Sequence, residues 1–95
     1  MNIANYSNVS AAEIKIYPNP INEKATIEFY LTQQEDVSAV LYNINGSLVW
    51  SAIEKTYPFG FNKINFEREN NMKPGVYFFK IRIGSNSYYT KCIFQ

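Results

Sequence analysis

The segment Ala25–Leu31 (ATIEFYL) alternates strictly between small or large apolar side chains and more polar ones. In an extended chain, Ala25, Ile27, Phe29 and Leu31 would point to one face, and the three residues between them to the other. This period-two alternation is typical of a strand with one face in a core and the other at the surface. The segment therefore predicts a half-buried β-strand.

Short apolar runs of the same kind recur along the chain and are separated by turn signals. The predicted strands are 14–17, 25–31, 37–42, 48–53, 61–66, 76–83 and 87–94. Asn45-Gly46 is the strongest hairpin signal, because both turn positions tolerate a positive φ. No stretch has a sustained helical period. The pattern predicts an all-β domain of about seven strands, either a sandwich or a barrel, with its last strand at a sheet edge.

The length of 95 residues fits one domain. The polar segment Met1–Glu13 is predicted to be a flexible linker, and residues 14–95 are predicted to form the folded domain. The first residues have neither the basic start nor the apolar run of a secretory signal peptide. If the protein is exported, this chain is therefore expected to be a fragment or to use another route. No apolar run approaches the ~20 residues that span a bilayer, so membrane insertion is not predicted.

Composition argues against a partner bound through bulk charge. Hydrophobic residues make up 46% and aromatic residues 17%, which favours a folded domain rich in strands. Nine basic residues nearly balance eight acidic ones. No basic field is expected that would attract nucleic acid or an anionic membrane. We therefore expect partners that recognise shape and sheet edges.

Catalytic chemistry has little support in the sequence. The chain contains no histidine and a single cysteine, Cys92, so the usual metal and nucleophile arrangements are missing. The acidic pairs Glu35-Asp36 and Glu67–Glu69 fall in predicted polar turns, as solvated charges. Cys92 is predicted to be a small apolar residue of the last strand. We predict no catalytic, cofactor-binding or metal-binding residues and no enzyme activity.

Two surface patterns each have a functional and a structural interpretation. An aromatic set is compatible with a sugar-binding surface or with ordinary cross-strand packing. Its members are Tyr30, Tyr42, Trp50, Tyr88 and Tyr89. A basic set, Lys80, Arg82 and Lys91, is compatible with a recognition stripe or with an ordinary solvated strand face.

Three segments in a fixed order add a family resemblance. They are Ile16–Pro20 (IYPNP, followed by ATIEF at 25–29), Val40–Val49 (VLYNINGSLV) and Lys73–Ile81 (KPGVYFFKI), with Lys91 in the last strand. In this order and spacing they resemble the type A C-terminal sorting domain of the type IX (Por) secretion system of Bacteroidetes-group bacteria. The resemblance covers Ile14–Gln95.

This resemblance implies an Ig-like antiparallel β-sandwich of about seven strands that follows a large extracellular cargo protein. Such domains fold in the periplasm, are recognised by the outer-membrane translocon and are then removed by a sortase that cleaves upstream. The cargo becomes secreted or cell-surface bound. By this resemblance, cleavage is expected within Met1–Glu13 or further upstream, and no cofactor or nucleic acid is expected.

The resemblance also implies candidate residues. The family's PxGxY-type motif corresponds to Pro74, Gly75 and Tyr77, and its terminal basic and apolar positions correspond to Lys91 and Ile93. A terminal edge strand would offer free N–H and C=O groups for strand addition, with Lys80, Arg82 and Lys91 adding charge selection. The candidate sorting-recognition residues are Pro74, Gly75, Tyr77, Lys80, Lys91 and Ile93.

Two alternatives stay open at this point. Gly75 and Tyr77 also fit a structural role, in which Gly75 permits a turn and the Tyr77 hydroxyl forms a tyrosine-corner-like hydrogen bond. The whole chain also fits a structural or carbohydrate-binding Ig-like module of a secreted enzyme. That alternative predicts saccharide binding on the aromatic set.

Overall fold

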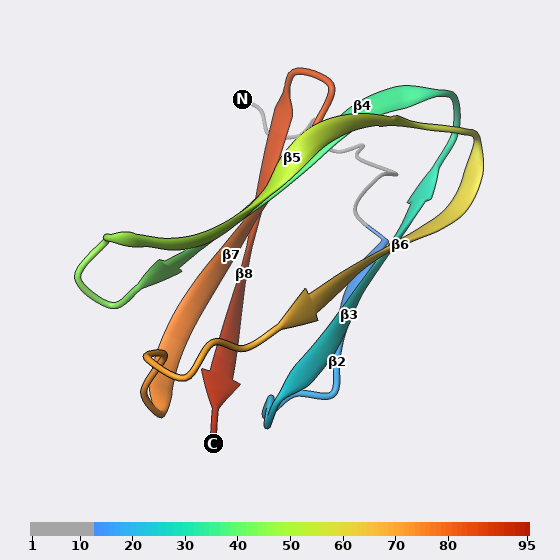
Figure 1. Cartoon of the computed structure of the whole chain (residues 1–95). Coiled ribbons are helices and arrows are strands. Elements are labelled where there is room, and N and C mark those ends of the chain that lie inside the picture. The colour runs from blue at the N-terminus through green and yellow to red at the C-terminus, as the bar shows by residue number, and fades with distance from the viewer. Residues whose placement is uncertain (1–12) are drawn as a thin grey trace.

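The computed structural model describes residues 13–95, which form seven strands and no helix (Figure 1). The strands are β2 (Ile14–Tyr17), β3 (Lys24–Leu31), β4 (Glu35–Asn43), β5 (Leu48–Tyr57), β6 (Gly60–Glu67), β7 (Gly75–Ile83) and β8 (Asn86–Phe94). The predicted linker lies outside the described residues except for Glu13, which is exposed. Within the described part of the chain there is no helix long and apolar enough to cross a membrane.

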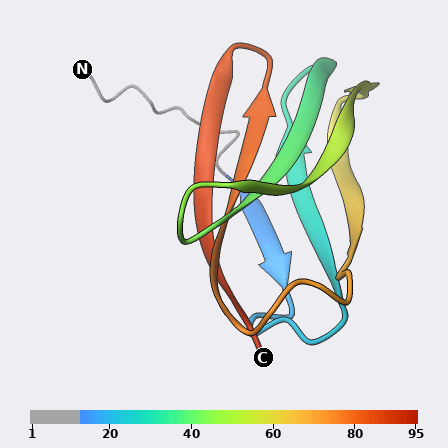
Figure 2. The ribbon, with the colours of Figure 1, turned by 60° about the vertical axis from the view of Figure 1, so that its left-hand side comes forward.

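The strands form two antiparallel sheets that pack face to face (Figure 2). One sheet has the order β2-β3-β6 and the other the order β5-β4-β7-β8. The chain passes from the second sheet to the first between β5 and β6, at Pro58-Phe59. The predicted antiparallel sandwich of about seven strands is confirmed. Strand β8 is an edge strand, as expected, because it pairs only with β7 among the described strands.

The core lies between the sheets and follows the period-two alternation. The apolar face of β3 is buried, as the Ala25–Leu31 pattern predicts. Phe66 of β6 is the centre of the aromatic packing. Its ring centroid lies 5.0 Å from that of Trp50, 5.5 Å from that of Phe79 and 5.7 Å from that of Phe94. The first two contacts are edge-to-face and the third is tilted. Such aromatic pairs stabilise a core beyond the area that they bury. One side chain of the first sheet thus joins three strands of the second.

The hairpin between β4 and β5 is present, but its turn differs from the prediction. Within this turn Gly46 alone has a positive φ, of 83°, and no described non-glycine residue has one. The Asn43 side chain accepts hydrogen bonds from the amides of Asn45 and Ser47, both at 2.9 Å. The Gly46 amide donates to the Asn43 carbonyl, also at 2.9 Å. Asn45 tolerates a positive φ but does not adopt one, because the Asn43 side chain and carbonyl accept these amides in a longer loop.

The polar turn predicted around Glu35-Asp36 is wrong, since both residues belong to β4. Asp36 pairs with Thr56 and accepts a hydrogen bond from its hydroxyl. Strand β5 accordingly continues to Tyr57, beyond the predicted end at residue 53. Such polar cross-strand pairs stabilise sheets without an apolar pattern that a sequence analysis would detect.

Cys92 is fully buried in β8, and its predicted role as a small apolar residue agrees with this position. Burial raises the pKa of its thiol from the ordinary value of 9.0 to about 11. The unfolded chain therefore loses this proton at a lower pH than the folded chain. The resulting stability is present in full below about pH 9 and is lost as the pH rises towards about 11.

We therefore expect the unfolding free energy of the wild-type domain to fall more steeply over this pH range than that of Cys92→Ala. Guanidinium titrations at both ends of the range measure the difference. Every other titratable group is common to the two proteins, so the comparison isolates the thiol. Equal slopes for the two proteins would contradict the assignment.

Candidate recognition site

The β7–β8 hairpin carries all the candidate residues except Pro74, which immediately precedes it. Its register places Ile93 opposite Val76, Lys91 opposite Phe78, and Tyr89 opposite Lys80. These pairs alternate with buried ones, so Lys80, Lys91 and Ile93 all point outward from the four-stranded sheet. The structure thus brings three of the six candidates to one face.

We call this surface the outer-face patch. It consists of Phe78, Lys80 and Arg82 from β7 and Tyr89, Lys91 and Ile93 from β8. Two of its apolar members are well exposed, with 65% of Tyr89 and 42% of Ile93 accessible to solvent, and Phe78 is half-buried. The Lys80 ammonium lies 6.0 Å from the centroid of the Tyr89 ring, within reach of a cation–π contact. The patch combines apolar surface with three cations, a composition suited to a protein partner.

The charge of this region departs from the near-neutral balance of the whole chain. Residues 1–69 contain five basic and eight acidic residues, whereas residues 70–95 contain four basic residues and no acidic one. Local net charge is therefore −3 in the first part and +4 in the second. The expectation that no basic field exists concerned the charge of the whole chain, and basic residues outnumber acidic ones only in the part after Glu69. Counting charges by segment, as opposed to over the whole chain, is the signal that would have revealed it.

The other three candidates lie apart from the outer-face patch. Pro74 and Gly75 form the turn that begins β7, where Gly75 has a φ of 143° that only glycine adopts readily. Tyr77 points to the inner face and is 7% exposed. Its hydroxyl donates a 2.7 Å hydrogen bond to the Lys73 carbonyl, and its ring stacks on Phe94 at 4.3 Å. This is the tyrosine-corner-like contact of the structural alternative.

We expect Tyr77→Phe to lower the unfolding free energy by about 1–3 kcal/mol, because the part-buried Lys73 carbonyl would lose its partner. For a domain of this size each kcal/mol lowers the Tm by roughly 4–8 °C. A thermal melt followed by circular dichroism measures the loss. Unchanged stability together with lost sorting would instead assign the hydroxyl to recognition.

The end of β8 is held by hydrogen bonds to residues far away in the sequence, which no local sequence pattern predicts. The Ile93 amide donates to the Asn19 side chain at 3.0 Å, and the Ile21 amide donates to the Ile93 carbonyl at 2.7 Å. The Gln95 amide then donates to the Ile21 carbonyl at 2.9 Å. The β2–β3 connection therefore covers the outer edge of β8 at its end, where the two segments meet in Figure 2.

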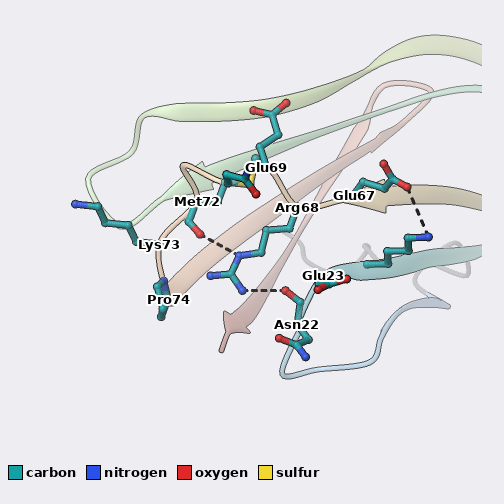
Figure 3. A pocket seen from close by; sticks show the side chains of 10 residues that line it. Asn22, Glu23, Glu67, Arg68, Glu69, Met72, Lys73 and Pro74 are labelled. Atoms are coloured by element: carbon teal, nitrogen blue, oxygen red, sulfur yellow. Dashed lines mark hydrogen bonds and ion pairs between the residues drawn. The ribbon is translucent and has the colours of Figure 1, made fainter.

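Arg68 completes this arrangement from the β6–β7 connection. Its Nε donates to the Met72 carbonyl at 2.9 Å, and its Nη1 donates to the Asn22 carbonyl at 2.8 Å (Figure 3). The same Nη1 also donates to the main-chain oxygen of Gln95 at 2.6 Å. The guanidinium also lies 5.0 Å from the centre of the Phe94 ring. We call Asn19, Ile21 and Arg68 the C-terminal clasp.

Arg68 is one of the residues that line a cleft of about 640 Å³, and Figure 3 shows it among the other lining side chains. The cleft mixes charges, with Glu67 paired to Lys24 at 3.8 Å beside it. The Arg68 donors just described are taken up by main-chain oxygens. In this cleft, Arg68 is therefore engaged in the contacts of the C-terminal clasp. Among residues 13–95, no group of three or more His, Cys, Asp or Glu side chains is placed to hold a metal ion.

The predicted aromatic set does not form one surface. Trp50 packs into the core against Phe66, and Tyr88 packs against the core from β8. Tyr42 and Tyr89 point outward from the four-stranded sheet, whereas Tyr30 points outward from the other sheet. A planar platform for a sugar ring is not built from these five side chains. The packing interpretation accounts for Trp50 and Tyr88.

Comparison with known families agrees with this geometry. The family described as "Secretion system C-terminal sorting domain" matches residues 15–95. The chain therefore belongs to the type IX secretion C-terminal sorting domains. Domains of this family mark secreted or cell-surface cargo for the type IX secretion machinery. No curated protein matches the chain.

Proposed function

We propose that this domain directs a covalently continuous cargo protein through the type IX translocon of the outer membrane. The domain folds in the periplasm, serves as a non-catalytic signal, and is separated from its cargo by a sortase. The observation that carries the proposal is the outer-face patch, which gathers exposed apolar and basic side chains on the edge hairpin. Membership of the sorting family over residues 15–95 supports it.

The candidate residues divide into two roles in this proposal. Lys80, Lys91 and Ile93 contact the secretion machinery directly, because their side chains share one outward face. Pro74, Gly75 and Tyr77 serve the signal by fixing the start of β7, which sets the position of the patch. Loss of either group impairs sorting, but only the second group does so by destabilising the domain.

The proposal is tested with a reporter that carries a signal peptide and is followed by residues 1–95. It is expressed in a host with a type IX system and compared with the same reporter lacking the domain. We expect only the first reporter to reach the surface or the medium. Mass spectrometry of the exported reporter is expected to locate cleavage within or upstream of residues 1–13. A folded fusion that accumulates in the periplasm would contradict the proposed function.

A further inference from the structure

Among the described residues, one edge of strand β8 pairs with no other strand, and the backbone of β8 shows which groups face that edge. The Ile93 amide and carbonyl both bond to the β2–β3 connection, so they point away from β7. Backbone groups of alternate residues in an antiparallel pair point the same way. The N–H and C=O groups of Ser87, Tyr89 and Lys91 therefore also point away from β7. In the part of the chain that the structure describes, no strand pairs with them.

The clasp limits the open stretch of this edge. It occupies the edge from Ile93 onward, through Asn19 and Ile21. The open stretch is therefore short and lies beside the cations of the patch, since Tyr89 is opposite Lys80 and Ser87 is opposite Arg82. A strand added here would have its outward side chains next to positive charge.

Charge decides which kind of strand fits. Neither β7 nor β8 contains an acidic residue, and the sequence has none after Glu69. Asp36, the acidic residue on the outward side of β4, is bonded to Thr56 on the side away from β7. Among the described residues, none of the three cations of the patch forms an ion pair with a carboxylate. An acidic partner would satisfy them, whereas a basic one would be repelled.

We propose that the secretion machinery adds an extended acidic segment to the edge of β8 along Ser87–Lys91, with its carboxylates facing Lys80, Arg82 and Lys91. This inference rests on the proposed function and names the chemistry of the partner. Main-chain hydrogen bonds to the free edge supply affinity, and the cations select the partner. The chain's own residues 1–12 contain no acidic side chain, so they lack this complementarity.

The substitution Tyr89→Pro tests main-chain pairing at the β8 edge without changing any charge. The Tyr89 N–H points outward, so Tyr89→Pro removes a group that β7 does not use, and edge strands tolerate such a proline. Tyr89→Ala removes the same side chain and keeps the N–H. Lys91→Glu reverses one charge of the patch. As a control, Lys63→Glu makes the same change at an exposed position of β6, in the other sheet.

The probe is a synthetic peptide of about nine residues in which glutamate alternates with threonine, compared with its lysine counterpart. We expect the acidic peptide to bind and to slow amide exchange at Tyr89 and Lys91, and the lysine peptide not to bind. Tyr89→Pro should abolish this binding while Tyr89→Ala retains the protection at Lys91. Lys91→Glu should weaken binding about tenfold, and Lys63→Glu should not weaken it.

Several outcomes would overturn the inference. These are equal binding of both peptides, binding unaffected by Tyr89→Pro, a dimer of this chain that Tyr89→Pro disperses, or binding that appears only when residues 1–12 are deleted. Export of the reporter fusion separates this inference from the proposed function. If wild type and Tyr89→Pro are exported equally, strand addition is wrong and the proposed function stands. If wild type is not exported, the proposed function itself fails.

Discussion

Replacing Phe66 with alanine is expected to lower the unfolding free energy by about 3–5 kcal/mol, the range measured for large-to-small changes of buried aromatic residues. Phe66 is 1% exposed, and its ring contacts the rings of Trp50, Phe79 and Phe94. Those rings belong to strands of the other sheet, so the cavity would open at the junction of the two layers. Small domains have only about 5–15 kcal/mol of stability in total.

The measurement is a guanidinium titration followed by tryptophan fluorescence, because Trp50 packs directly on Phe66. The matched control is Phe61→Ala in the same strand. Phe61 is 67% exposed and contacts only the Tyr30 ring among the aromatic pairs of the described residues. We expect that control to cost less than about 1.5 kcal/mol. Similar losses for the two variants would contradict the central role of Phe66.

Arg68→Ala is expected to lower the unfolding free energy by about 2–3 kcal/mol, through the loss of charge-assisted hydrogen bonds at a half-buried site. The substitution leaves the main-chain oxygens of Met72, Asn22 and Gln95 without the guanidinium. It also removes the contact with the Phe94 ring. Arg68→Lys should restore only part of the loss, because one ammonium group cannot reach three oxygens in the planar geometry of a guanidinium.

The clasp gives this variant a local signature that a general loss of stability lacks. The amides of Ile21 and Gln95 donate to the main chain beside Arg68. Under conditions where the domain remains folded, their hydrogen exchange should accelerate in Arg68→Ala while that of the β3 core amides stays unchanged. Lys73→Ala, an exposed neighbour in the same cleft, should leave both unchanged. Unaltered exchange at Ile21 and Gln95 in Arg68→Ala would contradict the clasp.

Strands were predictable because their signal is local. The alternation in Ala25–Leu31 and in β7 needs only the side-chain period of an extended chain and one buried face. The Tyr77 hydrogen bond could be anticipated for a similar reason, since its acceptor lies four residues upstream. The start of β4 at Glu35-Asp36 was missed, because polar residues that pair with an edge strand cannot be told from turn residues in the sequence.

The clasp could not be predicted from the sequence in this way. Arg68 reaches Asn22 across 46 positions and Gln95 across 27, and Asn19 reaches Ile93 across 74. Such pairs have no periodicity, and a single arginine or asparagine in a loop ordinarily predicts only a solvated side chain. The outer-face patch was partly predictable. Lys80 and Lys91 were candidates, but their common face depends on the register of β7 with β8.

The proposed function requires that the secretion machinery binds the folded outer face of the β7–β8 hairpin. It is tested most directly by export of the reporter fused to Lys80→Glu/Lys91→Glu. The control is Lys55→Glu/Lys63→Glu, which makes the same charge change at exposed positions of β5 and β6. Thermal melts must first establish that both variants are folded. We predict that the first reporter stays in the periplasm while the control is exported as wild type. Equal export of the two folded variants would contradict the claim.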